Sequence, residues 1–330
     1  MKPAAITMGC PVGVGPEIIL GLFDSLTTDE ATIAPVVLGD LGVLHHTAKL
    51  LHSKVKPVSW QIGQAIKPGT VPVLELSRLA TDALHWGQPT KETSLAMAEY
   101  IRQATQGTLA GDFAAVVTCP ISKKALNEAG IHYPGHTEML ADLTGARRYR
   151  MMMAGTRLRV VLVTIHEPLA KVSGMLSAEG ILDCIRMTAD SLHRDFALDR
   201  PRIAVAGFNP HSGEQGMFGR EEIEIIEPAL RQYEGDALIT GPWPPDTVFH
   251  KAANGEFDAV VCMYHDQGLI PFKLLHFKDG VNVTLGLPIV RTSVDHGTAY
   301  DIAGKGIADT ASLRSAWQLA TAIATNRARK

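Results

Sequence analysis

The sequence predicts an α/β protein with a largely parallel sheet, and three observations support this prediction. Its 330 residues suffice for roughly two domains at about 150 residues per domain. Short apolar runs alternate with amphipathic stretches along most of the chain, as in α/β proteins. The apolar runs lack polar alternation, which is typical of strands that are buried on both faces.

The apolar runs define the expected strands, and helical spacing of apolar residues defines helices between them. The expected strands span residues 4–8, 34–38, 113–118, 158–164, 203–206 and 258–263. One helix is expected up to Phe196 with Ser177 as its N-cap, because apolar residues recur there at helical spacing. Two more are expected at residues 90–108 and around residues 313–323.

The charge balance and the cysteines narrow the class of protein. The chain has 31 Lys and Arg against 34 Asp and Glu, a net charge of −3, which argues against a general binder of nucleic acid. No apolar run reaches the roughly 18 residues of a membrane span, and the N-terminal residues lack the core of a signal peptide. The four cysteines form no CxxC pair. We therefore expect a cytoplasmic enzyme with reduced thiols and no membrane partner.

Three histidines follow apolar runs in equivalent positions, and they are His166, His211 and His265. In open α/β sheets, ligand sites form at the carboxyl ends of strands. Three imidazoles there could converge on one divalent metal and leave positions open for a substrate. Asp266 could orient the ring of His265. The alternative is that each histidine is a hydrogen-bonded loop residue, but their shared placement favours the metal site.

A second group of residues predicts an anion site. Gly135 permits close backbone approach, and His136 and Thr137 offer donors for an anionic ligand. A helix that starts here with Thr137 as N-cap is a compatible alternative, because a helix N-terminus also attracts anions. Two cations and an amide follow the last of the three histidines, and they are Lys273, Asn282 and Arg291. Ordinary surface charge is the alternative for these three.

The chain contains neither the Rossmann fingerprint nor a P-loop. Residues 13–16, Gly-Val-Gly-Pro, only resemble a phosphate loop, and a glycine turn with Pro16 at a helix start is the simpler interpretation. Residues 295–306 are similar to the adenosine-binding loop of the isopropylmalate and isocitrate dehydrogenase family, which binds its dinucleotide without a Rossmann fold. A glycine-rich surface loop is the alternative.

This resemblance implies cofactor contacts from Asp295, His296, Gly297, Thr298, Ala299, Asp301, Ile302 and Gly304. In that family an acid followed by Ile goes with NAD, and a Lys-Tyr pair goes with NADP. A carboxylate accepts hydrogen bonds from the ribose 2′-hydroxyl and repels a 2′-phosphate. Asp301 and Ile302 therefore point to NAD.

With these segments in view, the chain resembles the 4-hydroxythreonine-4-phosphate dehydrogenase family from Thr7 to about Asp309. The segments that carry the likeness are residues 13–17, 133–138, 209–211, 265–268 and 286–298. By analogy with the isopropylmalate and isocitrate dehydrogenases, we expect two α/β/α lobes with a cleft between them. Residues 1–117 plus 286–330 would form the nucleotide lobe, and residues 118–285 the metal, substrate and dimerisation lobe.

The resemblance also implies an activity and a set of site residues. The reaction would be metal- and NAD-dependent oxidation and decarboxylation of a 4-phosphorylated four-carbon 3-hydroxy acid. The metal, which could be zinc, cobalt, magnesium or manganese, would be held by His166, His211 and His265. Substrate contacts are implied for His136, Thr137, Lys273, Asn282 and Arg291. The candidate catalytic residues are His136, Asp266 and Lys273. Family members are homodimers with the site at the subunit interface.

Two departures from the family pattern bear on the choice of substrate. Cys10 stands where the family commonly has an acidic residue, and Ser122 where it usually has Asn. Tyr133 and Tyr264 look more like the branch that oxidises threonate or erythronate 4-phosphate. A third branch acts on aromatic cis-dihydrodiols and departs at the Gly-His-Thr-Glu loop, which is intact here. The remaining candidate functions are a non-catalytic ligand sensor and a lyase that needs no nucleotide.

Overall fold

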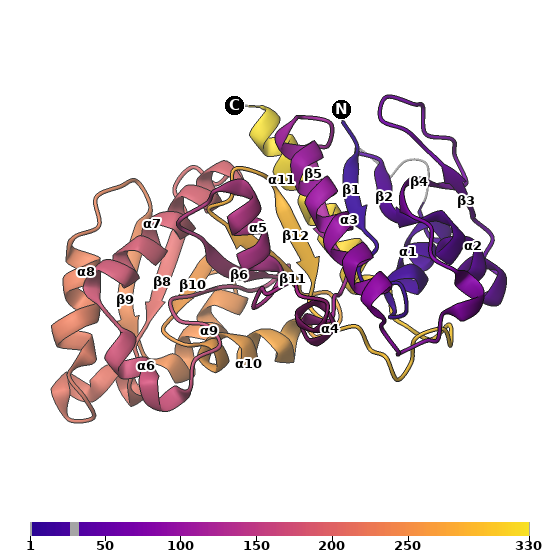
Figure 1. Ribbon diagram of the computed structural model, residues 1–330. Coiled ribbons are helices and arrows are strands. Elements are labelled where there is room, and N and C mark those ends of the chain that lie inside the picture. Colours follow the sequence, from indigo (N-terminus) through magenta and orange to yellow (C-terminus); the bar gives the residue numbers. More distant parts are fainter. Residues whose placement is uncertain (1, 27–32, 330) are drawn as a thin grey trace. The chain divides into compact units, whose positions relative to one another are not determined.

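The computed structural model describes residues 2–26 and 33–329, and the chain divides into two compact units (Figure 1). Unit 1 comprises Met1–Arg147 and Leu287–Ala324, and unit 2 comprises Arg148–Gly286 and Thr325–Lys330. Each unit combines a sheet with helices. The predicted α/β class is confirmed.

The sheet of unit 1 has the strand order β3-β4-β2-β1-β5-β12, and its neighbouring strands pair in parallel. The strands are β1 (Ala4–Thr7), β2 (Pro35–Asp40), β3 (Lys56–Ser59), β4 (Thr70–Ser77), β5 (Ala115–Thr118) and β12 (Arg291–Val294). The central strands β1, β2 and β5 are buried along their whole length. The expected strands at residues 4–8, 34–38 and 113–118 are confirmed.

The helices of unit 1 are α1 (Gly15–Asp24), α2 (Leu41–Leu50), η1 (Thr81–Ala83), α3 (Lys91–Leu109), α4 (Lys123–Glu128), α5 (His136–Thr144) and most of α11 (Ala311–Ala328). Helix α3 packs across β1, β2 and β5 (Figure 1). It begins with a reciprocal cap, in which the Thr93 amide donates to Thr90 Oγ1 at 3.3 Å and the Thr90 amide donates to Thr93 Oγ1 at 2.8 Å. The helices expected at 90–108 and 313–323 are confirmed.

The sheet of unit 2 has the strand order β11-β6-β7-β10-β8-β9. The strands are β6 (Arg150–Ala154), β7 (Arg159–Leu162), β8 (Arg202–Ala206), β9 (Leu238–Trp243), β10 (Ala259–Cys262) and β11 (Val281–Leu285). Strands β7, β10, β8 and β9 are parallel, whereas β6 runs antiparallel to both of its neighbours. The expected strands at 158–164, 203–206 and 258–263 are confirmed.

The helices of unit 2 are α6 (Leu169–Met175), α7 (Ala178–Arg194), η2 (Pro210–Gly216), η3 (Glu222–Ile226), α8 (Glu227–Arg231), α9 (Pro245–Ala253) and α10 (His265–His276). Ser177 caps α7 as expected, since its hydroxyl accepts a hydrogen bond from the Gly180 amide at 3.1 Å. Helix α10 packs Leu269 and Phe272 into the same buried cluster as Val160 of β7 and Val260 of β10. This packing fixes the start of α10 at the end of β10.

The boundaries of the units differ from the lobes expected from the sequence. The first boundary lies after Arg147, whereas the expected lobe ended at residue 117. Helices α4 and α5 pack on α3, which keeps residues 118–147 with unit 1. At the other end, Asn326 donates to the Asp195 carbonyl at 2.8 Å, and Arg327 pairs with the Asp195 carboxylate, so residues 325–330 group with unit 2.

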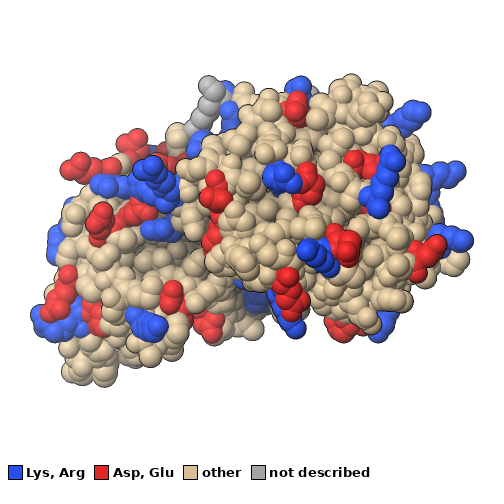
Figure 2. All heavy atoms as spheres, in the orientation of Figure 1, with Lys and Arg blue, Asp and Glu red and all other residues tan. Residues whose placement is uncertain are grey.

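The surface carries charges of both signs. On the face shown in Figure 2, basic and acidic side chains are interspersed among uncharged residues. Every helix in the described ranges is too short or too polar to cross a membrane.

Candidate active site

Two of the three predicted metal ligands meet in unit 2. His166 follows β7 and His265 follows β10, and these strands are parallel neighbours in which Val160 pairs with Val260. The two imidazole rings have centroids 5.6 Å apart. His265 Nδ1 lies 2.7 Å from a carboxylate oxygen of Asp266, which leaves Nε2 to face a ligand. The predicted role of Asp266 as an orienting group therefore has a geometric basis.

His211 lies in η2, after β8, and its ring is 6.5 Å from that of Phe218. In residues 2–26 and 33–329, no three His, Cys, Asp or Glu side chains are grouped so as to hold a metal ion. The structure thus brings two predicted ligands together, and metal ligation by all three histidines stays a prediction.

Two of the three predicted metal ligands, His166 and His211, are exposed and adopt the left-handed backbone conformation. His166 has a φ of 45°, and every residue from His211 to Gln215 has a φ between 44° and 76°. This conformation costs an L-residue roughly 1–2 kcal/mol. It persists where surrounding contacts over-determine the backbone, which is common at functional sites.

Glu222 is one such contact for the loop that carries His211. Its buried carboxylate accepts hydrogen bonds from the amides of Phe208 and Asn209, both at 2.7 Å, and from Asn209 Nδ2 at 3.0 Å. A Cβ atom added at Gly213 would lie 2.7 Å from Glu222 Oε2, so the loop folds closely around the carboxylate. Sequence reasoning missed Glu222, because charged residues in this stretch resemble a solvated helix face.

Gln267 joins two of the histidine loops. Its buried side chain accepts a hydrogen bond from the Met263 amide at 2.7 Å and donates one to the Gly207 carbonyl at 2.6 Å. Met263 precedes His265, and Gly207 begins the loop that leads to His211. The sequence contained Gln267 within a motif but did not indicate this role.

Two predicted substrate contacts also lie in unit 2. Lys273 stands on α10 seven residues after Asp266, and this spacing places both on one side of the helix. Asn282 lies on β11 opposite Met153. Its buried Oδ1 atom has no hydrogen-bond partner within the described part of the chain. A buried acceptor of this kind indicates a bound water or ligand.

Arg291 opens β12 in unit 1. The residue is buried, and its Nη2 atom donates to Thr118 Oγ1, at the end of β5, at 2.8 Å. Burial lowers the pKa of Arg291 to about 10, and the Glu138 carboxylate acts in the opposite direction. The guanidinium therefore keeps its charge at neutral pH.

His136 is the first residue of α5, after Gly135 as N-cap. Its Nε2 atom is buried and has no hydrogen-bond partner among the described residues. Burial, followed by the charges of Arg291 and Lys123, holds the pKa of His136 well below its usual range, so the ring is neutral at pH 7. The interpretation of Thr137 as N-cap is wrong: Thr137 lies inside the first turn, because the extended residue before the helix is Gly135.

The segment from Asp295 to Gly306 follows β12, and helix α1 holds it in place. The Val14 amide donates to the Thr298 carbonyl at 3.1 Å. The buried Glu17 carboxylate accepts hydrogen bonds from the amides of Gly304 at 3.2 Å and Ala308 at 2.9 Å. The sequence motif around Glu17 did not indicate this anchoring role.

The start of α1 confirms the simpler interpretation of residues 13–16. Val14 is the N-cap, and Pro16 lies in the first turn. Glycine is required at position 15, because a Cβ atom there would lie 2.1 Å from the Met8 carbonyl oxygen. These residues form a helix start rather than a phosphate loop.

Trp86 packs against the far end of the 295–306 segment. A Cβ atom at Gly304 would lie 2.7 Å from both Cδ1 and Nε1 of the indole, and Gly304 has a φ of 78°. Asp301, the predicted ribose ligand, is exposed. The segment is therefore anchored at Thr298 and Gly304 and presents Asp301 between these two anchors.

Cys10 and Ser122, the two positions noted in the sequence analysis, contact one hydroxyl. Cys10 Sγ lies 3.4 Å from the Tyr300 hydroxyl, which also hydrogen-bonds to Ser122. Burial raises the pKa of both Cys10 and Tyr300, so the group is uncharged at neutral pH. Cys10, Ser122 and Tyr300 therefore form an uncharged polar group.

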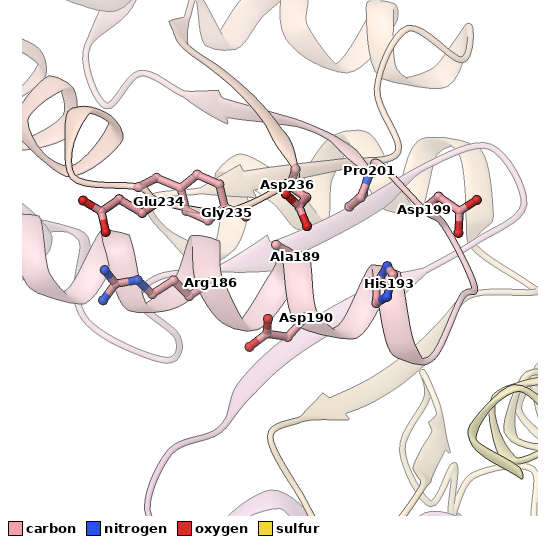
Figure 3. A pocket seen from close by; sticks show the side chains of 11 residues that line it. Arg186, Ala189, Asp190, His193, Asp199, Pro201, Glu234, Gly235 and Asp236 are labelled. Carbon is pink, nitrogen blue, oxygen red and sulfur yellow. The ribbon is translucent and has the colours of Figure 1, made fainter. Parts of the chain in front are cut away.

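A pocket of about 350 Å³ in unit 2 contains none of the predicted site residues (Figure 3). Arg186, Asp190 and His193 of α7 line it. Residues 233–237, between α8 and β9, form another wall. This pocket is distinct from the histidine pair and from Asn282.

Together the fold and the polar groups after its strands define an α/β enzyme. A family model described as pyridoxal phosphate biosynthetic protein PdxA matches residues 31–320. The chain belongs to this PdxA family. The resemblance inferred from the sequence motifs is confirmed.

Similar proteins cover nearly the whole chain. The chain is 54% identical over 323 residues to a 4-hydroxythreonine-4-phosphate dehydrogenase of Desulfosudis oleivorans, covering 96% of this chain and 94% of the relative. It is 52% identical over 323 residues to the protein of that name in Desulforapulum autotrophicum, covering 97% of this chain and 95% of the relative.

Solved structures agree with these sequence relatives. A crystal structure of 4-hydroxythreonine-4-phosphate dehydrogenase from Klebsiella pneumoniae is 40% identical, with a TM-score of 0.88 over 98% of this chain and 100% of that chain. A terephthalate 1,2-cis-dihydrodiol dehydrogenase from Burkholderia xenovorans is 29% identical, with a TM-score of 0.66 over 97% of this chain and 98% of that chain. The sequence identity and the TM-score are both higher for the Klebsiella pneumoniae structure.

Proposed function

We propose that this protein is an NAD-dependent 4-hydroxythreonine-4-phosphate dehydrogenase. It would oxidise the C3 hydroxyl of its substrate, after which the β-keto acid loses CO2. The observation that carries the proposal is the neutral His136, whose buried Nε2 atom has no partner within the described residues, beside the buried cation Arg291. This pair suits an anionic substrate, and relatives of that name support the choice.

The anionic groups of the substrate would be held by cationic and neutral donors. Arg291 supplies a guanidinium that can donate two hydrogen bonds to one phosphate. His136 and Thr137 lie in the first turn of α5, where backbone amides also favour an anion. Lys273 and Asn282 are proposed as further contacts, and the unpartnered Oδ1 of Asn282 supports its role.

The chemistry of the histidine donors fits a divalent metal. His166, His211 and His265 would hold it, and nitrogen ligands favour zinc or cobalt over magnesium. When bound, the metal would act as a Lewis acid towards the C3 hydroxyl and the developing enolate. The carboxylate of Asp266 would fix the ring of His265, to which it is already bonded.

Of the three candidate catalytic residues, His136 is proposed as the proton acceptor, because burial keeps its ring neutral at pH 7 and its Nε2 atom has no hydrogen-bond partner among the described residues. Asp266 is engaged by His265, and Lys273 would serve as a point charge for the substrate.

The proposed cofactor is NAD, bound along the loop from Asp295 to Gly304. Contacts are proposed for the eight residues implied by the sequence resemblance, which are Asp295, His296, Gly297, Thr298, Ala299, Asp301, Ile302 and Gly304. The exposed carboxylate of Asp301 would accept hydrogen bonds from a ribose 2′-hydroxyl and would repel a 2′-phosphate. The four buried free thiols support a reducing cytoplasmic location.

We propose that the protein forms a homodimer, because the exposed side of α10 is apolar. Ile270, Leu274 and Phe277 are 60%, 82% and 77% exposed, and their spacing forms one apolar stripe along the helix. Lys273 belongs to the same stripe. A second copy of the chain would cover this stripe and bring Lys273 to the interface. Leu274→Asp should therefore yield monomers in sedimentation velocity, whereas Leu95→Asp, another exposed leucine, should leave the dimer intact.

The test of the function follows NADH formation at 340 nm with and without EDTA. The substrates are 4-phosphohydroxythreonine, D-threonate 4-phosphate and D-erythronate 4-phosphate, each offered with NAD and with NADP. Turnover of the amino acid with NAD, abolished by EDTA, supports the proposal. Turnover of only the sugar-acid phosphates would instead support a threonate or erythronate 4-phosphate dehydrogenase. No turnover of any substrate by metal-loaded protein would refute it.

A further inference from the structure

Lys123 lies beside the predicted anion site of unit 1, although neither the motifs nor the family resemblance assigned it a role. It is the first residue of α4, which Ser122 caps by accepting a hydrogen bond from the Ala125 amide at 3.2 Å. A Cβ atom at Gly135 would lie 3.2 Å from Lys123 Cε and 3.5 Å from its Nζ. The lysine side chain therefore runs across the bare backbone of Gly135, directly before His136.

The groups around Lys123 carry an excess of positive charge. The same Cβ position on Gly135 lies 3.1 Å from Glu138 Oε2, so one carboxylate approaches this point as well. The positive charges of Arg291 and Lys123 act on His136, and the negative charge of Glu138 acts on Arg291. With His136 neutral, the cluster of Lys123, Arg291, Glu138 and His136 holds two positive charges and one negative charge.

We propose that Lys123 is a further substrate-binding residue, whose ammonium group contacts the phosphate of the substrate beside Arg291 and His136. Glycine at position 135 is what lets the lysine reach this place. Lysine acts as a point charge, and arginine supplies directional donors, so the two cations complement each other. A phosphate monoester carries about −1.5 to −2 charges at pH 7, which matches a site with surplus positive charge. The inference rests on the proposed function.

Lys124 provides a matched control within the same helix. It is also exposed, and its Nζ lies 3.8 Å from Glu128 one turn further along α4. The two lysines thus share their charge, helix and exposure, but only Lys123 borders Gly135.

The experiment compares Lys123→Met, Lys123→Arg and Lys124→Met in the full chain. Inorganic phosphate binding is measured by calorimetry at low salt, without NAD or turnover. The pKa of His136 is measured by NMR, with His136→Gln used to assign its signal. Circular dichroism melting checks that each variant is folded.

Lys123→Met should weaken phosphate binding about 10- to 100-fold, the usual effect of losing a charge-assisted contact. The pKa of His136 should rise, because one nearby positive charge is gone. Lys123→Arg should restore most of the affinity, and Lys124→Met should change neither quantity. The rise in the pKa of His136 would show that the ammonium group lies beside the ring in solution, and the loss of phosphate affinity tests the binding role.

Phosphate affinity within twofold of the wild type in Lys123→Met would overturn the proposal. Equal losses in Lys123→Met and Lys124→Met would also overturn it, because they would show a general effect of surface charge. If phosphate binding depends on Lys123 but 4-phosphohydroxythreonine gives no NADH, the proposed function fails and the phosphate contact stands.

Discussion

Gln267 Nε2 donates a 2.6 Å hydrogen bond to the carbonyl oxygen of Gly207, sixty residues away in the chain. Its Oε1 atom accepts a second bond from the Met263 amide at 2.7 Å. One buried side chain therefore spans the ends of β8 and β10, from which the loops of His211 and His265 depart. The distance between these two loops therefore depends on the side-chain amide of Gln267, whose NH2 group donates to Gly207 and whose oxygen accepts from Met263.

Replacing Gln267 by Leu should loosen both loops. The Gly207 carbonyl and the Met263 amide would lose their partner, at a cost of roughly 2–4 kcal/mol in free energy of unfolding. Affinity for Co²⁺ should fall about 10- to 100-fold, as for other residues that orient metal ligands. Urea denaturation and cobalt absorption spectra measure the two effects. Gln103→Leu, which removes only a bond to Glu99 on α3, is the control. A destabilised Gln267→Leu protein with wild-type cobalt affinity would show a purely structural role.

Glu222→Gln tests the support of the His211 loop. Glu222 Oε1 accepts two backbone amides, and Oε2 accepts Asn209 Nδ2. A glutamine can keep its oxygen towards the backbone, but its NH2 group then faces the NH2 group of Asn209. We expect a loss of about 1–3 kcal/mol in unfolding free energy together with weaker cobalt binding. Glu224→Gln changes an exposed residue that pairs with Arg220, and it should be neutral. Equal losses of stability and cobalt affinity in Glu222→Gln and Glu224→Gln would contradict the role of Glu222 in supporting the His211 loop.

Glu17→Gln should act on the cofactor rather than on the chemical step. Each carboxylate oxygen of Glu17 accepts one amide, from Gly304 or from Ala308, and a glutamine can accept only one of them. The proposed NAD loop should then be less well held. The KM for NAD is expected to rise roughly three- to tenfold with kcat nearly unchanged, as for loss of uniform binding. Glu92→Gln, at an exposed position of α3, should leave both constants unchanged. A large fall in kcat with an unchanged KM for NAD would contradict the role of Glu17 in holding the NAD loop.

Asp195 should make stability depend on acid pH. Burial alone favours its neutral form, but hydrogen bonds from Arg194 and Arg327 lower the pKa of Asp195 from its usual 3.8 to about 2. The folded state therefore binds the proton more weakly than the unfolded state. The resulting stabilisation, about 2 kcal/mol, is complete above pH 4 and is lost as the pH falls towards 2.

Asp195→Asn removes this contribution. The difference in unfolding free energy between the wild type and Asp195→Asn should be largest near pH 7 and should shrink between pH 4 and pH 2. Urea denaturation at a series of pH values measures it, and Asp199→Asn, at an exposed position, serves as control. A difference that stays constant with pH would rule out the ion pairs as its source.

The strands that the sequence predicted are those that bury continuous apolar runs, such as residues 4–8 and 258–263. Strands β3, β4, β6, β9, β11 and β12 were not predicted, because each carries proline, charged or other polar residues in place of a continuous apolar run. The antiparallel pairing of β6 with β11 is also non-local, since Asn282 lies opposite Met153. No local pattern near residue 153 encodes that partner, so the β6–β11 pair emerges only when the sheet is assembled.

The histidine pair could be predicted because His166 and His265 each follow a recognisable buried strand, and the strands prove to be neighbours. Glu17, Glu222 and Lys123 could not be assigned roles in the same way. A charged residue in an amphipathic stretch is usually solvated, and only the folded chain shows that Glu17 meets Gly304 from 287 residues away.

The contact between Trp86 and Gly304 gives the protein a built-in optical probe. The emission of an indole responds to the polarity and mobility of its surroundings, and this indole touches the end of the 295–306 segment. Trp317, in contrast, is fully buried, and its Nε1 atom is bonded to the Ile33 carbonyl. Ligands that settle on the segment should therefore change the fluorescence of Trp86, and the loss of this change in Trp86→Phe would distinguish it from the emission of Trp60, Trp243 and Trp317. Occupancy could then be followed in unlabelled protein before any reaction takes place.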